Sequence, residues 1–218
     1  MHTKTIIAST AAALAFAATA HGQAFVNGSM TGPMATSTAP AGWTSWSGTV
    51  DTADATGPFN YTGLPWMPSP DGGTFVRAGA GTTSEGLSQV VSGFTVGVAY
   101  QIDFFQTNLG FVNPSGGAWT GDDGHFDLYI DGVAVASSTT ISKPVLPDNS
   151  IVWTAESLTF VATSTTHDIG FLAVRVPTGS LAAYMGIDGV RVSQVPAPGV
   201  LATLGGLALT TRRRRAAI

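Results

Sequence analysis

The chain has 218 residues, of which only 10% are charged and 27 are glycine, a composition that favours a β-rich, turn-rich domain. It contains no cysteine, which excludes disulfide scaffolds, cysteine-ligated zinc, iron–sulfur clusters and thiol catalysis. Residues 21–194 hold four basic residues against all thirteen acidic ones, a net charge of −9, which excludes a nucleic-acid-binding surface built on clustered Lys and Arg.

The N-terminus has the three parts of a secretory signal peptide. Lys4 supplies positive charge, residues 6–18 are apolar, and Ala18 and Ala20 flank a small-residue cleavage site, with a second candidate cut after Ala24. The apolar run is too short to cross the roughly 30 Å of a hydrocarbon core. We therefore expect residues 1–24 to form a signal helix that directs export and is removed by signal peptidase.

Aromatic residues crowd the Pro- and Gly-rich stretch 40–70. Trp43 follows a glycine at the edge of the expected domain, and we predict that it packs in the core. The same prediction applies to Trp153, which lies in an apolar segment that we expect to be a strand. These two indoles are therefore interpreted as structural.

From Gly73 onward, apolar and polar residues alternate between turn residues, which is the pattern of antiparallel strands. Asp131-Gly132 separates two alternating runs and predicts a hairpin, because both central positions of a type I′ turn need positive φ. No helix is expected between the two ends of the chain. The pattern predicts one all-β domain at 25–194, an antiparallel β-sandwich with jelly-roll topology. The candidate strands are 73–79, 86–94, 98–106, 125–138, 156–163, 167–176 and 185–193.

The long loop "NLGFVNPSGGAWTGDDG" between two of these strands is a candidate ligand site. Sugar rings stack on exposed indoles while carboxylates bind their hydroxyls, so Trp119 beside Asp122 and Asp123 could hold a glycan. Equally, Trp119 could anchor the loop. The acidic run "TGDDGHFD" could also contribute oxygens to Ca²⁺ or be a solvated turn. His125 and His167 are expected to be ordinary surface or strand-edge residues.

Support for catalysis is weak. The sequence has no nucleophile elbow, zinc-protease helix, phosphate-binding loop or dinucleotide fingerprint. Glycoside hydrolysis needs only two facing carboxylates, so a secreted polysaccharide-acting enzyme stays open as the alternative. We expect a protein that is not an enzyme.

The last 24 residues read "VPAPGVLATLGGLALTTRRRRAAI". Pro196 and Pro198 disfavour a helix that continues upstream, and they mark an accessible boundary. The apolar run 199–209 predicts a short helix that could enter a bilayer with recruited neighbours. Arg212, Arg213, Arg214 and Arg215 would then stay cytoplasmic by the positive-inside rule.

A short motif, an apolar stretch and a terminal arginine cluster, in that order, resemble the PEP-CTERM sorting signal of Gram-negative bacteria. The motif here is Val195, Pro196, Ala197 and Pro198, so Ala197 replaces the central Glu of the family motif. The resemblance implies that residues 195–218 are recognised and processed by an exosortase after transient anchoring in the inner membrane. It also implies a passenger associated with extracellular polysaccharide and biofilm.

The middle of the chain resembles galactose-binding-like jelly rolls. The segments that carry this likeness are "FVNGSM", "GW", "PDGG", "GLSQVVSGFTVGVAYQIDF" and "GIDGVRVS". The resemblance implies a structural Ca²⁺ where the first and last strands meet, near Asn27 and Asp188. The alternative is that Asn27 is a turn residue and Asp188 caps a strand turn.

These observations predict an exported protein of the cell envelope, cell surface or extracellular matrix. Its β-sandwich would serve a structural or carbohydrate-binding role, with exosortase, signal peptidase and extracellular polysaccharide as partners. No cofactor other than a structural Ca²⁺ is expected.

Overall fold

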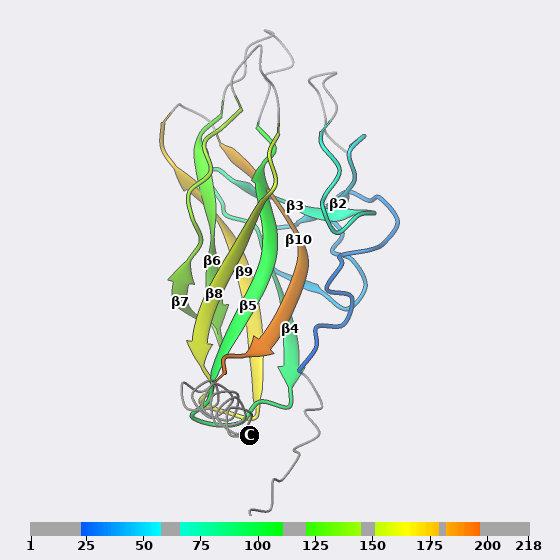
Figure 1. Cartoon of the computed structure of the whole chain (residues 1–218). Helices are drawn as coiled ribbons and strands as arrows, with labels where there is room; N and C mark the ends of the chain where they lie inside the picture. The colour runs from blue at the N-terminus through cyan, green and yellow to red at the C-terminus, as the bar shows by residue number, and fades with distance from the viewer. Residues whose placement is uncertain (1–22, 58–65, 111–120, 145–150, 179–181, 197–218) are drawn as a thin grey trace, which may run out of the picture.

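The computed structural model describes residues 23–57, 66–110, 121–144, 151–178 and 182–196. These residues form two five-stranded antiparallel sheets packed face to face, and they contain no helix (Figure 1). The all-β sandwich predicted from the sequence is confirmed. The described part of the chain also lacks any helix long and apolar enough to span a bilayer. The predicted signal helix, Trp119 and the tail from Ala197 onward lie outside the described residues.

The two sheets are built from ten strands. Sheet 1 has the spatial order β2 (Asp51–Ala53), β3 (Phe75–Ala80), β10 (Ala183–Gln194), β5 (Ala99–Asn108) and β8 (Thr154–Val161). Sheet 2 has the order β1 (Thr44–Ser47), β4 (Gly86–Ser92), β9 (Thr166–Val176), β6 (Asp123–Ile130) and β7 (Val133–Ser137).

The connections give the topology. From β3 onward each strand crosses to the opposite sheet, except at the β6–β7 hairpin, and this is the paired Greek-key order of a jelly roll. All seven predicted segments are strands, and β1 and β2 were not predicted. In the hairpin, Asp131 (φ 52°) and Gly132 (φ 79°) both adopt the positive φ that the sequence predicted.

Alternation along the strands fills the space between the sheets. On β6, Phe126, Leu128 and Ile130 are buried, and the residues between them face outward. Trp43 is buried as predicted and stacks on Phe25 with ring centroids 5.2 Å apart. This main core lies between the sheets, so any ligand-binding surface must lie on an outer face, at an edge or in a loop.

A second, smaller cluster covers part of the outer face of sheet 1. It contains Trp66, Phe75, Leu109 and Ile151. Trp153 packs against this cluster as a partly buried residue just before β8, so its predicted place in a strand is wrong. Segments outside the sheets thus close this face.

Candidate functional site

Trp46 on β1 lies on the outer face of sheet 2. Its side chain is 42% exposed, and it packs beside Tyr129 of β6 with ring centroids 5.1 Å apart at an angle of 54°. The indole Nε1 donates a hydrogen bond of 3.1 Å to the backbone oxygen of Leu87. The indole is therefore held in place while much of its surface stays open to solvent.

Two glycines make room for this indole. Gly86 of β4 and Gly170 of β9 lie between Trp46 and Tyr129, since β4 and β9 separate β1 from β6. A Cβ on Gly86 would come within 2.9 Å of the Trp46 ring, and a Cβ on Gly170 within 3.0 Å of Nε1. The absence of side chains here lets the indole lie across the strands. We call Trp46, Tyr129, Gly86 and Gly170 the Trp46 platform.

Polar groups continue the same face beyond Tyr129. His125 Nε2 lies 3.2 Å from Asp127 Oδ1, and Ser137 Oγ donates to the same carboxylate over 2.6 Å. His125 and Asp127 alternate with the buried residues of β6 and so point outward with Tyr129, and Ser137 is the cross-strand partner of Asp127 on β7. An aromatic surface beside a few polar groups is the usual composition of a small-ligand site.

Asp122 and Asp123, predicted as ligand contacts, hold the start of β6. Asp122 is fully buried, pairs with Arg175 Nε and accepts the backbone N–H of Thr178 over 2.8 Å. Asp123 Oδ1 accepts the backbone N–H of Lys143 over 3.0 Å. A ligand in solution cannot reach the Asp122 carboxylate unless the Arg175 pair opens.

Asp188 is a buried carboxylate in the centre of sheet 1. It lies at a bulge of β10, where Gly189 has a φ of 62°, and its side chain is 0% exposed. Neither oxygen has a hydrogen-bond partner of normal geometry among the described residues. Burial raises the pKa of Asp188 to about 7, and the charge of Asp71 adds to this, against opposing contributions from the Ser69 hydroxyl and Arg191.

Asp71 approaches the same bulge, since a Cβ on Gly189 would lie 3.2 Å from the Asp71 Cβ. One Asp71 oxygen pairs with Arg191, and the other is buried without a partner within the described chain. Three buried oxygens of these two carboxylates lack a hydrogen bond of normal geometry, although the Ser69 hydroxyl and the Gly189 N–H lie near Asp188 and the Ser29 hydroxyl lies near Asp71. Carboxylate oxygens suit a hard cation such as Ca²⁺, whose shell of six to eight ligands would need carbonyls or waters as well. Asp188 and Asp71 would hold that ion, which would neutralise their buried charge. The described residues contain no group of three His, Cys, Asp or Glu side chains that could hold a metal ion.

Asn27 is engaged in its own loop. Its amide nitrogen donates to the backbone oxygens of Thr31 and Ala41, both at 2.9 Å, and its oxygen accepts the Thr31 N–H. These bonds are those of a turn residue. Asp71, which the sequence analysis did not single out, is the side chain that lies against the Asp188 bulge.

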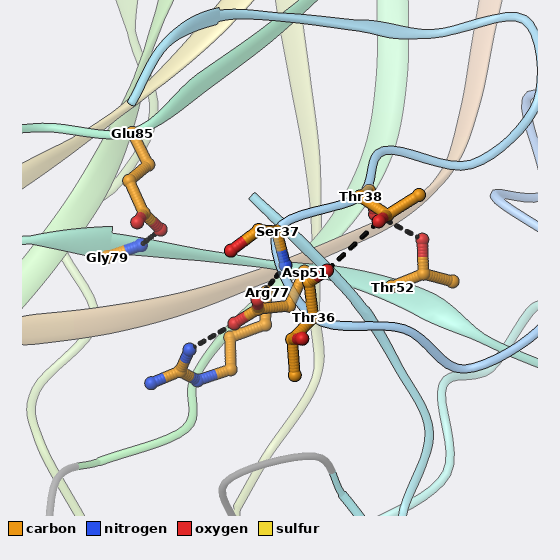
Figure 2. A network of polar contacts seen from close by, with 8 residues as sticks. All are labelled: Thr36, Ser37, Thr38, Asp51, Thr52, Arg77, Gly79 and Glu85. Atoms are coloured by element: carbon orange, nitrogen blue, oxygen red, sulfur yellow. Dashed lines mark hydrogen bonds and ion pairs between the residues drawn. The ribbon is translucent and has the colours of Figure 1, made fainter. Parts of the chain in front are cut away.

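A polar network closes the outer face of sheet 1 near β2 and β3 (Figure 2). Arg77 pairs with Asp51, whose other oxygen accepts the backbone N–H of Ser37 over 2.8 Å. Thr52 Oγ1 donates to the backbone oxygen of Thr38 over 2.8 Å. The Arg77–Asp51 pair is almost fully buried. Because Asp51 also accepts the Ser37 N–H, the pair fastens the N-terminal segment to the sheet.

Glu85 extends this network. Its carboxylate accepts the backbone N–H of Gly79 over 2.5 Å, and the Arg77 guanidinium lies 3.9 Å from the centre of the Tyr184 ring. Burial raises the pKa of Glu85, and Asp51 adds to the rise, while the Gly79 bond and Arg77 oppose it. All these charges are engaged within the fold.

His167 is fully buried, so its predicted surface position is wrong. Its Nε2 accepts the backbone N–H groups of Thr163 and Ser164, both at 3.2 Å, so Nδ1 carries the proton and donates to Asp131 Oδ2 over 2.7 Å. The histidine thus ties the β8–β9 turn to the β6–β7 hairpin.

No family model and no curated protein matches the chain. Among solved structures it is similar to a Stig cyclase, Fisc, from Fischerella sp. TAU (14% identity, TM-score 0.50, covering 81% of this chain and 98% of that one). It is also similar to TmCBM61 in complex with β-1,4-galactotriose (14% identity, TM-score 0.42, covering 71% of this chain and 90% of that one). A third similar structure is a family 16 carbohydrate-binding module (14% identity, TM-score 0.42, covering 78% of this chain and 98% of that one). The cyclase likeness shows a shared fold alone.

Proposed function

We propose that this protein is an exported carbohydrate-binding β-sandwich that holds neutral polysaccharide on the outer face of sheet 2. The observation that carries the proposal is the exposed Trp46 indole, fixed by its bond to Leu87 and laid across Gly86 and Gly170. An indole that served only to fill the core would be buried, whereas the Trp46 side chain is 42% exposed. Gly86 and Gly170 have no side chains that would push the indole off the sheet.

The chemistry fits a sugar. The C–H face of a pyranose ring packs on an indole, and the row formed by His125, Asp127 and Ser137 offers donors and acceptors to ring hydroxyls. The domain is acidic, so a neutral glycan suits it better than a polyanion, which its charge would repel. Two of the similar structures are carbohydrate-binding modules, but the Trp46 platform of this chain, not that likeness, carries the proposal.

The test is a binding titration of the full chain against neutral polysaccharides, with β-galactan, xylan and β-glucan as the probes. We expect saturable binding to at least one glycan and a loss of at least tenfold in affinity, about 1.4 kcal/mol, for Trp46→Ala. Val96→Ala is the matched control, because Val96 is 58% exposed and lies in the turn before β5. Absence of binding to all three probes, or equal affinity of the two variants, would leave a purely structural matrix protein.

The second part of the proposal concerns delivery. The signal peptide 1–24 exports the chain, and the tail 195–218 is read at Val195–Pro198 by an exosortase-type enzyme while Arg212–Arg215 retain it at the membrane. Intact mass and cell fraction of the protein from its native host test this. We expect loss of both ends and recovery in the envelope or matrix. An unchanged location and mature mass when all four arginines are replaced by serine would refute sorting by the tail.

A further inference from the structure

β7 and β8 lie side by side at the free edges of the two sheets (Figure 1). A groove runs along these edges. It encloses about 550 Å³ and is lined by Val133 and Val135 of β7, Phe160 and Val161 of β8, Ala99 of β5, and Asp131 at the hairpin. We call it the lateral groove.

The walls of the lateral groove are unusually apolar for sheet edges. β7 and β8 are the outermost strands of their sheets, and Val133, Val135 and Val161 are 63%, 46% and 57% exposed. Natural sheets normally protect an edge with charge, proline or a covering segment, because an apolar edge recruits other chains. An occupant of this groove would remove that liability.

The chain itself delivers an apolar segment to this place. Val195, just after β10, donates its backbone N–H to the oxygen of Ala99 over 3.0 Å, and Ala99 lines the groove. Residues 199–209 follow and contain Leu201, Leu204 and Leu207 without any charge. β8 lies two strands from β10 in sheet 1, about 10 Å away. Four residues, 195–198, separate β10 from the apolar segment, and four residues of extended chain can span about 13 Å. The segment therefore begins within reach of the groove.

Charge supports the same occupant. Asp131 lines the groove, and Asp168, which is exposed, donates its backbone N–H to the Asp131 carboxylate over 2.9 Å. Burial raises the pKa of Asp131, but the bonds from Asp168 and His167 outweigh it and leave the pKa below its usual value, so this carboxylate is ionised at neutral pH. Arg212–Arg215 follow the apolar segment in the sequence.

We propose that, away from a membrane, residues 199–209 of this same chain dock in the lateral groove, with the arginine cluster beside Asp131 and Asp168. The groove then covers the apolar tail before it is transferred to a bilayer. Docking at this edge is independent of glycan binding at the Trp46 platform, which lies on the outer face of sheet 2.

Disulfide trapping tests the proposal, because the chain has no cysteine of its own. Val161→Cys is combined in turn with Leu201→Cys, Leu204→Cys and Leu207→Cys in the full chain, in detergent-free buffer. The matched control replaces Val161→Cys by Val152→Cys, which is similarly exposed (61% against 57%) but nine residues away, about 30 Å along an extended chain.

We expect at least one groove pair to form an intramolecular disulfide at least tenfold faster than its control pair, as measured by intact mass and non-reducing electrophoresis. Equal rates for groove and control pairs would overturn the proposal. Disulfides found only between two chains would also overturn it, in favour of a second copy as the occupant.

Hydrogen exchange gives a second readout that needs no cysteine. Amides of β7 and β8 are expected to exchange at least fivefold more slowly in the parent chain than in the Leu201→Ser, Leu204→Ser, Leu207→Ser triple variant, while β4 is unchanged. Equal exchange at β7 and β8 in the two chains would contradict docking.

Discussion

The aromatic residues on the outer face of sheet 1 are buried, whereas the indole on the outer face of sheet 2 is exposed to solvent. On sheet 1, Phe75 is fully buried between Trp66 and Trp153, and Arg77 and Asp51 are sealed beneath the N-terminal segment. On sheet 2, Trp46 has a single aromatic neighbour among the described residues and stays 42% exposed. Aromatic burial on sheet 1 contributes stability, whereas the indole on sheet 2 is available for a ligand.

Removing one aromatic ring from each face tests whether the two faces differ in role. Phe75→Ala is expected to lower the free energy of unfolding by about 3–5 kcal/mol, because it leaves a cavity in a packed cluster. Trp46→Ala is expected to lower it by less than about 1 kcal/mol, since its site is open to solvent. Urea denaturation of both variants measures the difference. If both substitutions cost the same, Trp46 is a structural residue and the two faces do not differ in role.

The next largest effect is expected from Ca²⁺ on sheet 1, where the buried carboxylates Asp188 and Asp71 lie. At a Ca²⁺ concentration of 100 times its dissociation constant, the parent chain is expected to gain about 2.7 kcal/mol in stability. Asp188→Asn is expected to gain nothing, because it loses the charge that attracts the ion. Thermal unfolding with Ca²⁺ and with EDTA measures both, and Asp54→Asn serves as the control because its carboxylate bonds within its own turn, to Thr56, just after the edge strand β2. A parent chain that does not respond to Ca²⁺ would remove the metal site.

A smaller effect is expected from Gly170→Ala on sheet 2. The added Cβ would come within 3.0 Å of Trp46 Nε1, so the indole must lift from the sheet. We expect glycan affinity to fall by about three- to tenfold, with a change in unfolding free energy below about 1 kcal/mol. Titration and denaturation of the same sample separate the two effects. Unchanged affinity would mean that the glycines do not set the platform.

The smallest expected effect concerns Glu85, at the border of the covered face. Burial raises its folded pKa above the usual value of 4.5, so its contribution to stability is fully present below that pH and is lost as the pH rises through the folded value. Glu85→Gln removes the titration but keeps an acceptor for the Gly79 N–H. We expect the variant's stability to fall less steeply than the parent's as the pH rises above 4.5. A steeper fall in the variant would contradict the raised pKa.

Strands could be predicted from the sequence where apolar and polar residues alternate within one continuous segment. Seven segments and the Asp131-Gly132 hairpin could be located because period-two patterning and turn chemistry lie within a few residues of each other. β1 and β2 were missed because they are only four and three residues long and lie in a Pro- and Gly-rich stretch.

The candidate sites depend on contacts between distant segments, and for that reason they were not predicted. The Trp46 platform needs glycines from β4 and β9 in register with β1, and nothing near Trp46 in the sequence indicates them. The buried His167 donates a hydrogen bond to Asp131, which is 36 residues away in the sequence. Asp188 was singled out from a resemblance, but its neighbour Asp71 could be found only from the fold.

The position of β10 governs when the domain can form. The last strand of the described residues lies in the middle of sheet 1, paired with β3 on one side and β5 on the other. During synthesis, the two halves of that sheet therefore have no shared partner until residues 183–194 have left the ribosome. β3 and β5 therefore cannot take their places in sheet 1 until β10 has inserted between them.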